Sequence, residues 1–127
     1  MSERELAMKV IIAGLRDFND YDLFKDKLEL MIQENEIEVT EIVSGGASGV
    51  DTMAERYGNE KGIPVKKFNA DWKKYGRSAG PVRNKEMAEY VGEKGALIAF
   101  WDFQSKGTGS MIKIAEKLKL RIYICKV

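Results

Sequence analysis

The chain has 127 residues, of which 44% are hydrophobic and 32% are charged, and its formal net charge at pH 7 is +1. This length fits one domain, and this composition is typical of a folded globular protein rather than a disordered or membrane-spanning chain. A net charge near zero also disfavours a protein that wraps broadly around nucleic acid.

The first half of the chain alternates strand-like and helical segments. A continuous apolar run over residues 8–14 predicts a buried strand, and apolar side chains at helical spacing predict a helix over residues 21–34. The same criteria predict a short strand at 41–44, a helix at 50–60 and a third strand at 64–68.

The second half repeats this alternation after a long loop, which we expect over residues 69–80. Pro81 is tolerated in a first helical turn, so it can open the next helix. Residues 96–101 are apolar without alternation, which predicts a central strand that is covered on both faces. Thr108 is expected to cap a fourth helix, and residues 121–125 supply the last strand.

Five strands that alternate with four helices predict an α/β protein with a Rossmann-like, doubly wound parallel sheet. The expected strand order is 3-2-1-4-5, with helices on both faces. In such sheets ligands bind outside the carboxyl ends of the strands, near the switch between strands 1 and 4. We therefore expect one domain, residues 8–127, with a ligand site at this edge.

Several chemistries are disfavoured by what the sequence lacks. It has no histidine, which is the commonest metal ligand and general base, and its one cysteine cannot form an internal disulfide. Cys125 lies in an apolar run, so we interpret it as a core residue. Residues 1–7 form a short extension without an apolar signal core, so we expect a cytoplasmic protein with no membrane partner.

A glycine-rich turn joins the second strand to the second helix, with the sequence Ser44-Gly45-Gly46-Ala47-Ser48-Gly49-Val50-Asp51. Glycines let backbone N–H groups approach an anion, and the helix that follows offers unpaired donors. The spacing matches neither G-x-x-x-x-G-K-[ST] nor G-x-G-x-x-G. The turn therefore predicts a phosphate site, although a tight turn that binds nothing is the alternative. Asp51 either complements the helix dipole or contacts the ligand.

Two further loops lie at the same predicted edge. Arg16 directly follows the first strand and could bind a phosphate or carboxylate, or it could form a surface ion pair. Residues 105–110 form a second turn rich in glycine and hydroxyl groups at the start of a helix. This turn predicts a second anion site, with an ordinary helix cap as the alternative.

The segment 66–85 is strongly basic, with seven basic residues and one acid. The net charge of this segment is +6, so the net charge of the rest of the chain is −5. The segment is either an electropositive mouth for an anionic ligand or a solvated surface. Trp72 could stack on a base or pack the loop onto the domain, and Arg83 could point back into the crevice.

The ordered set of motifs resembles the SLOG superfamily, and more narrowly the YspA type of small stand-alone SLOG proteins. The resemblance runs from about Met8 to the C-terminus and implies a Rossmann-like fold that binds nucleotides or nucleotide-derived molecules. The motifs that carry it are Gly14-Leu15-Arg16-Asp17-Phe18, the glycine-rich turn, Asp71-Trp72, Gly80-Pro81-Val82-Arg83-Asn84-Lys85-Glu86-Met87, Ala99-Phe100-Trp101-Asp102 and Lys106-Gly107-Thr108.

Two departures from the family patterns bear on function. Leu15 stands where the family usually has serine, which removes one hydroxyl from the predicted site. The related LOG phosphoribohydrolases carry a catalytic glutamate three residues after their glycine-threonine motif, and this chain has Met111 there. Methionine cannot exchange a proton, so hydrolysis in the LOG manner is disfavoured.

We predict a protein that binds a small phosphorylated ligand derived from a nucleotide and requires no cofactor. The alternatives are a nucleotide N-glycosidase or phosphoribohydrolase and a single-stranded DNA-binding module; nucleic acid is a less favoured partner, and a homo-oligomer is left open. The predicted ligand-binding residues are Gly14, Arg16, Ser44, Gly45, Gly46, Ser48, Gly49, Asp51, Trp72, Arg83, Asp102, Lys106, Gly107 and Thr108.

Overall fold

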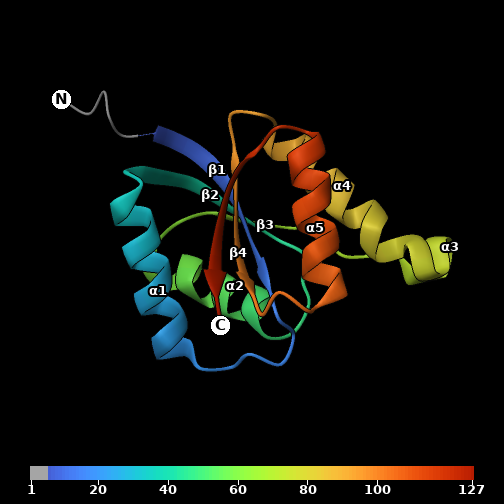
Figure 1. The fold of residues 1–127 in the computed structure, drawn as a ribbon, viewed down its shortest axis with the longest axis horizontal. Coiled ribbons are helices and arrows are strands. Elements are labelled where there is room, and N and C mark those ends of the chain that lie inside the picture. The colour runs from blue at the N-terminus through green and yellow to red at the C-terminus, as the bar shows by residue number, and fades with distance from the viewer. Residues whose placement is uncertain (1–5) are drawn as a thin grey trace.

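The structure is a computed structural model that describes residues 6–127 (Figure 1). All neighbouring strands are parallel, and their order is β3-β2-β1-β4-β5. The predicted α/β, Rossmann-like sheet with the order 3-2-1-4-5 is therefore confirmed. The strands are β1 (Leu6–Gly14), β2 (Ile37–Ser44), β3 (Val65–Lys67), β4 (Ala96–Trp101) and β5 (Arg121–Lys126).

Helices cover both faces of the sheet, as expected for a doubly wound fold. The first two long helices pack on one face and the last two on the other (Figure 1). None of the helices within residues 6–127 is long and apolar enough to cross a membrane. The helical elements are α1 (Tyr21–Glu34), α2 (Val50–Lys61), α3 (Trp72–Tyr75), the 3-10 turn η2 (Gly76–Ser78), α4 (Ala79–Val91) and α5 (Lys106–Lys117).

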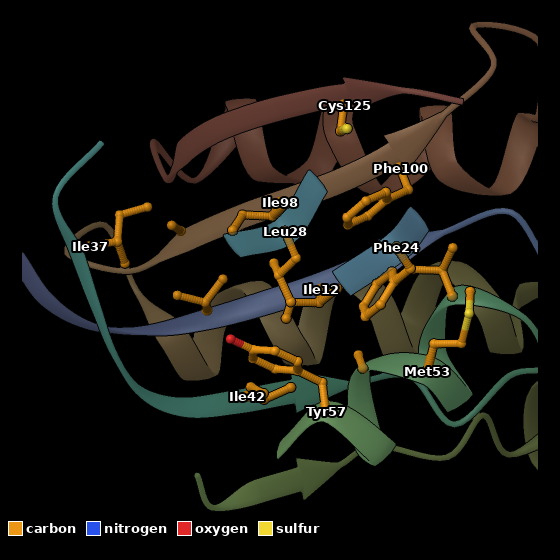
Figure 2. Packing of buried hydrophobic residues seen from close by; sticks show 14 of the residues in the cluster. Ile12, Phe24, Leu28, Ile37, Ile42, Met53, Tyr57, Ile98, Phe100 and Cys125 are labelled. Atoms are coloured by element: carbon orange, nitrogen blue, oxygen red, sulfur yellow. The ribbon is translucent and has the colours of Figure 1, made fainter. Parts of the chain in front are cut away.

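The core consists of two apolar layers, one on each face of the sheet. Alternation along β1 sends Ile12 to the layer beneath α1 and α2 and Ile11 to the layer beneath α4 and α5. Figure 2 shows the first layer, in which Phe24 of α1 packs against Phe100 of β4 with ring centroids 4.8 Å apart. Residues 96–100 of β4 are fully buried because β1 and β5 flank this strand and helices cover both its faces.

The carboxyl ends of β1 and β4 approach each other closely. Gly14 is in register with Phe100, and a Cβ atom at Gly14 would lie 2.5 Å from the Phe100 carbonyl oxygen. It would also lie 2.9 Å from Cγ2 of Val50, at the start of α2. A glycine at this position therefore lets the first strand, the fourth strand and α2 meet at the edge where the site was predicted.

Two strands begin earlier than predicted. β1 begins at Leu6, within the predicted extension 1–7, whose residues 1–5 lie outside the described part of the chain. β2 begins at Ile37 rather than at residue 41, because this stretch pairs in parallel register with the start of β1. An apolar run could not reveal this half of β2, since Ile37 is its only buried residue.

Two helix starts also differ from the prediction. The predicted loop 69–80 contains α3 and η2, and the Asp71 carboxylate caps α3 by accepting a hydrogen bond from Lys74 N at 3.1 Å. A four-residue helix is too short to show periodicity in the sequence. The prediction that Thr108 caps the last helix is wrong, because α5 begins at Lys106 and Ser105 occupies the N-cap position.

Candidate functional site

A cleft of about 710 Å³ opens at the carboxyl edge of the sheet, where the ends of β1 and β4 meet α2, α4 and α5. We call it the main cleft. The predicted ligand-binding residues that line it are Gly14, Arg16, Asp51, Trp72, Arg83, Asp102, Lys106, Gly107 and Thr108. Four separate loops therefore converge on one site, as expected from the strand order.

A second cleft of about 240 Å³ lies beside the glycine-rich turn, and we call it the side cleft. Ser44 and Gly49 line neither the main nor the side cleft. The residues that line the side cleft alone are Gly45, Gly46, Ser48, Asn69 and Ala70, and those that line both clefts are Arg16, Ala47, Trp72 and Arg83. The two clefts are therefore neighbouring compartments of one site.

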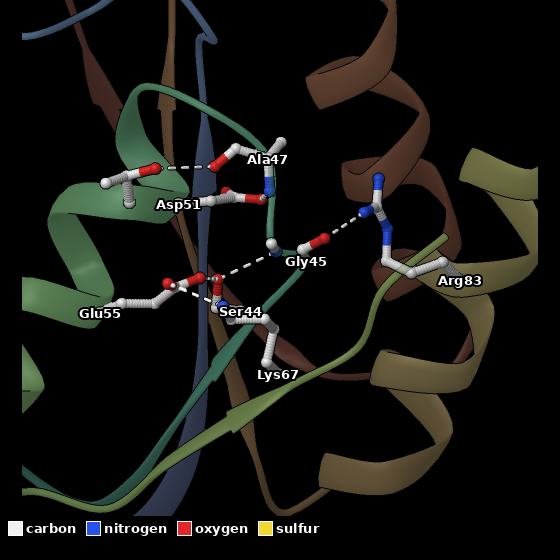
Figure 3. A network of polar contacts seen from close by, with 9 residues as sticks. Ser44, Gly45, Ala47, Asp51, Glu55, Lys67 and Arg83 are labelled. Atoms are coloured by element: carbon white, nitrogen blue, oxygen red, sulfur yellow. Dashed lines mark hydrogen bonds and ion pairs between the residues drawn. The ribbon is translucent and has the colours of Figure 1, made fainter. Parts of the chain in front are cut away.

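The glycine-rich turn is held in place by its own hydrogen bonds (Figure 3). The buried Ser44 hydroxyl donates to a Glu55 carboxylate oxygen at 2.6 Å and accepts from Gly46 N at 3.1 Å. The other Glu55 oxygen lies 3.4 Å from Nζ of Lys67 on β3. Ser44 and the Gly46 N–H are therefore satisfied by the fold.

Two further hydrogen bonds hold the start of α2. Asp51 is only 7% exposed, and its carboxylate accepts a hydrogen bond from Ala47 N at 3.1 Å. Val50 N donates to the Leu15 carbonyl at 3.1 Å. Burial raises the pKa of Asp51, and the hydrogen bond from Ala47 opposes this shift. The Asp51 carboxylate thus accepts from one N–H group of the turn that the sequence predicted to bind phosphate.

Gly49 and Gly45 make this closed turn possible. Gly49 has φ 73°, and a Cβ atom there would lie 2.3 Å from the Leu15 carbonyl oxygen. A Cβ atom at Gly45 would lie 2.8 Å from Nη1 of Arg83 and 3.0 Å from Oδ2 of Asp51. The buried cation and the buried carboxylate therefore both pack against the face of Gly45.

Arg83 projects from α4 toward the glycine-rich turn and is only 8% exposed (Figure 3). Its Nε donates to Oδ1 of Asn84 at 2.9 Å, and its Nη1 donates to the Gly45 carbonyl. Burial lowers the pKa of Arg83, and the charge of Asp51 opposes this shift. A guanidinium has five N–H donors, so three remain without a partner among residues 6–127.

The start of α5 has an open set of donors. Its first helical hydrogen bond runs from Gly109 N to the Ser105 carbonyl, which leaves the N–H groups of residues 106–108 without partners in the described chain. The first turn contains no acid, and Ser105 makes no side-chain cap bond. Thr108 is only 5% exposed, and its hydroxyl has no hydrogen-bond partner among residues 6–127. Thr108 lines the main cleft, and its hydroxyl oxygen is not fully buried, since every fully buried side-chain N or O atom of the described residues is hydrogen-bonded.

Asp102 holds the loop that leads into α5. Its carboxylate accepts from Ser105 N at 2.8 Å and from Gln104 N at 2.9 Å, and these two bonds lower its pKa. Trp72, in contrast, is 54% exposed and lines both clefts, so the loop is not anchored by burial of this ring.

Sequence reasoning missed several residues that line the main cleft. Asn84 and Met87 lie one and four positions after Arg83 on α4, and Met111 lies three positions after Thr108 on α5. Helical spacing from the two predicted residues would have found them. Within residues 6–127, no group of three or more cysteine or acidic side chains could hold a metal ion.

Comparisons with known proteins agree with this architecture. Residues 8–75 match the model of the YAcAr family, described as the YspA, cpYpsA-related SLOG family. The gene 61 protein of Mycobacterium phage D29 is 30% identical over 114 residues, which cover 86% of this chain and 89% of that protein.

A solved structure shares the fold. DNA processing protein A from Streptococcus pneumoniae superposes with a TM-score of 0.67 at 19% sequence identity. The match covers 92% of this chain and 50% of that protein, so the chain spans about half the length of this relative. On the family match and the phage relative together, the chain belongs to the YspA, cpYpsA-related SLOG family.

Proposed function

We propose that the chain binds a nucleotide or a nucleotide-derived phosphorylated ligand in the main cleft, with a phosphoryl group at the start of α5. The observation that carries this proposal is Thr108, a largely buried residue that lines the cleft and whose hydroxyl makes no hydrogen bond within residues 6–127 although its oxygen is not fully buried. A hydroxyl that the fold leaves unpaired at a cleft wall is free to bind a ligand, and a hydroxyl can donate a hydrogen bond to a phosphoryl oxygen.

The surroundings of Thr108 favour an anion. The open N–H groups of residues 106–108 and the positive end of the α5 dipole meet at this point. Lys106 adds a positive charge to the same wall. The α2 turn offers less, because Ser44 and Asp51 already accept from two of its N–H groups, those of Gly46 and Ala47, and Asp51 places a carboxylate there.

The rest of the main cleft suits the nucleoside. Its volume of about 710 Å³ is within the range of small-molecule sites, roughly 300–1,000 Å³. Pro81, Met87 and Met111 provide apolar surface, and Trp72 offers an exposed aromatic ring for stacking on a base.

Thermal unfolding tests the proposal with a panel of nucleosides and nucleoside 5′-monophosphates. We expect monophosphates, but not nucleosides, to raise the Tm, because a ligand that binds only the folded state stabilises it by mass action. Thr108→Val should remove this rise, since it deletes the hydroxyl and keeps the shape. Thr40→Val makes the same chemical change at an exposed position on β2 and should leave the rise intact. A panel without any Tm shift would refute the proposal.

The N-glycosidase alternative finds less support at the site. Met111 is buried at the position where the LOG relatives carry glutamate, and Glu86 lines another cleft with Asp71 and Lys74. Asp102 lines the main cleft, but its lowered pKa and its two backbone donors make it a weak base. We therefore infer binding rather than hydrolysis.

A short single strand of DNA is the second candidate. It is favoured by α3, which lies at the end of α4 that is far from the sheet (Figure 1). This helix exposes Trp72 and Tyr75, with Lys73 and Lys74 between them in the sequence. Stacked aromatics with nearby cations are typical of single-strand binding. DNA processing protein A shares the fold. We rank this candidate second because the excess positive charge of +6 is confined to residues 66–85.

The cytoplasmic location and the self-association of the chain also stay predictions.

A further inference from the structure

We propose that the ligand carries two separated phosphoryl groups and that the side cleft holds the second one. This inference rests on the proposed binding of a nucleotide in the main cleft. It places a binding site beside the glycine-rich turn, formed by Arg16 and Arg83, which line the side cleft. This site does not depend on the N–H donors at the start of α2.

The side cleft is positive and contains no acid among the described residues that line it. Its charged residues are Arg16 and Arg83, and its polar side chains are Ser48 and Asn69. A volume of about 240 Å³ is below the range of sites for whole small molecules but can accept a phosphoryl group.

The two arginines have capacity for an anion. Three N–H donors of the buried Arg83 guanidinium have no partner within residues 6–127. The Arg16 side chain is exposed and makes no hydrogen bond or ion pair with the described residues. A guanidinium binds phosphate through paired, charge-assisted hydrogen bonds. A phosphoryl group between these residues would satisfy donors that the fold leaves open.

The arrangement of the clefts favours separated rather than adjacent phosphoryl groups. Of these two clefts, Lys106 and Thr108 line the main cleft alone, whereas Ser48 and Asn69 line the side cleft alone. Trp72 lines both, so a nucleoside against its ring would have one anion site on each side. A nucleoside 3′,5′-bisphosphate has this chemistry, and so does a 5′-phosphorylated dinucleotide.

Isothermal titration calorimetry at fixed ionic strength can test this geometry. The probes are the 5′-monophosphate, 5′-diphosphate and 3′,5′-bisphosphate of each of the four ribonucleosides, together with a 5′-phosphorylated dinucleotide. We expect the best 3′,5′-bisphosphate to bind about tenfold more tightly than its monophosphate, the gain of one charge-assisted contact. The 5′-diphosphate should gain less than threefold. A dinucleotide tighter than the bisphosphate would also support the proposal and identify a strand end as the source.

Asn69→Asp places a carboxylate in the acid-free side cleft without changing the shape of the side chain. We expect it to lower the affinity for the bisphosphate about tenfold, to the level of the monophosphate, and to leave monophosphate binding within twofold. Gln33→Glu makes the same change in charge on the exposed surface of α1 and should alter neither affinity. Retained monophosphate binding also shows that Asn69→Asp is folded.

The outcomes separate this inference from the proposed function. If no nucleotide binds, the proposed function fails. If monophosphates bind and the bisphosphates gain nothing, or if Asn69→Asp weakens both ligands equally, only the second phosphoryl site is refuted.

Discussion

The turn after β2 and the turn after β4 both lead into a helix at the same edge of the sheet, but they differ in their hydrogen bonds. In the first, Ser44 and Asp51 accept from Gly46 N and Ala47 N. In the second, the Asp102 carboxylate accepts from Gln104 N and Ser105 N, and the N–H groups of residues 106–108 have no partner within residues 6–127. We call them the closed turn and the open turn. Glycine and hydroxyl content alone does not make an anion site, because the fold can supply the anion itself.

The closed turn gives the largest expected effect on stability. Gly49→Ala would place Cβ 2.3 Å from the Leu15 carbonyl oxygen and 2.5 Å from the backbone of Arg16, at a position with φ 73°. Backbone atoms cannot rotate away, so we expect a loss of about 3 kcal/mol or more in the free energy of unfolding. Urea unfolding followed by circular dichroism measures this loss.

Gly62→Ala is the matched control for this prediction. Gly62 has φ 70° at the other end of α2, and nothing lies within 4 Å of the position of its Cβ. Its ψ of 26° puts it in the left-handed helical region, whereas Gly49 has ψ −124°, so the control carries a milder backbone strain and no clash, and we expect a loss of about 1 kcal/mol. Equal losses in the two variants would show that the two loops do not meet as described.

Removal of the hydroxyl group should cost much more stability in the closed turn than in the open turn. Ser44→Ala removes the two hydrogen bonds of the buried Ser44 hydroxyl, to Glu55 and from Gly46 N, and should cost about 1–2 kcal/mol of unfolding free energy. Thr108→Val should cost less than about 0.5 kcal/mol, because its hydroxyl has no partner to lose within residues 6–127. Thermal and urea unfolding of the ligand-free proteins measure both values.

Ser78→Ala controls for loss of a hydroxyl at an exposed site, and it should be neutral, since Ser78 makes no side-chain cap bond before α4. A costly Thr108→Val would mean that its hydroxyl is used by the fold, and the proposed phosphoryl site would lose its main support.

The architecture follows from local sequence patterns, but the difference between the turns does not. Apolar runs and helical spacing predict the strand order, and the order brings the four loops together. The state of the closed turn depends on Glu55, eleven residues after Ser44, whose carboxylate fixes the direction of the serine hydroxyl. It also depends on how α4 aims Arg83 at the Gly45 carbonyl. Neither contact can be predicted from the spacing of residues along one segment, because each joins residues of different segments.

The aspartates of the two turns offer the smallest and finest test, because their pKa values shift in opposite directions. Burial raises the pKa of Asp51 in the native state. The native state then binds more protons than the unfolded state, so this group favours folding at low pH and loses that effect as pH rises through its native pKa. Asp51→Asn should therefore become more stable relative to the wild type as pH rises from about 4 to about 7.

Asp102 should give the opposite sign. Hydrogen bonds from Ser105 N and Gln104 N lower its native pKa, so its contribution is present above the ordinary aspartate pKa and is lost as pH falls through the native value. Asp102→Asn should therefore become less stable relative to the wild type as pH rises from about 2 to about 5. Unfolding free energies across a pH series of the three proteins give both slopes. If the relative stability of the two variants changed with pH in the same direction, the Asp51 carboxylate would not be buried in the closed turn. The two turns would then not differ in the environment of their aspartates.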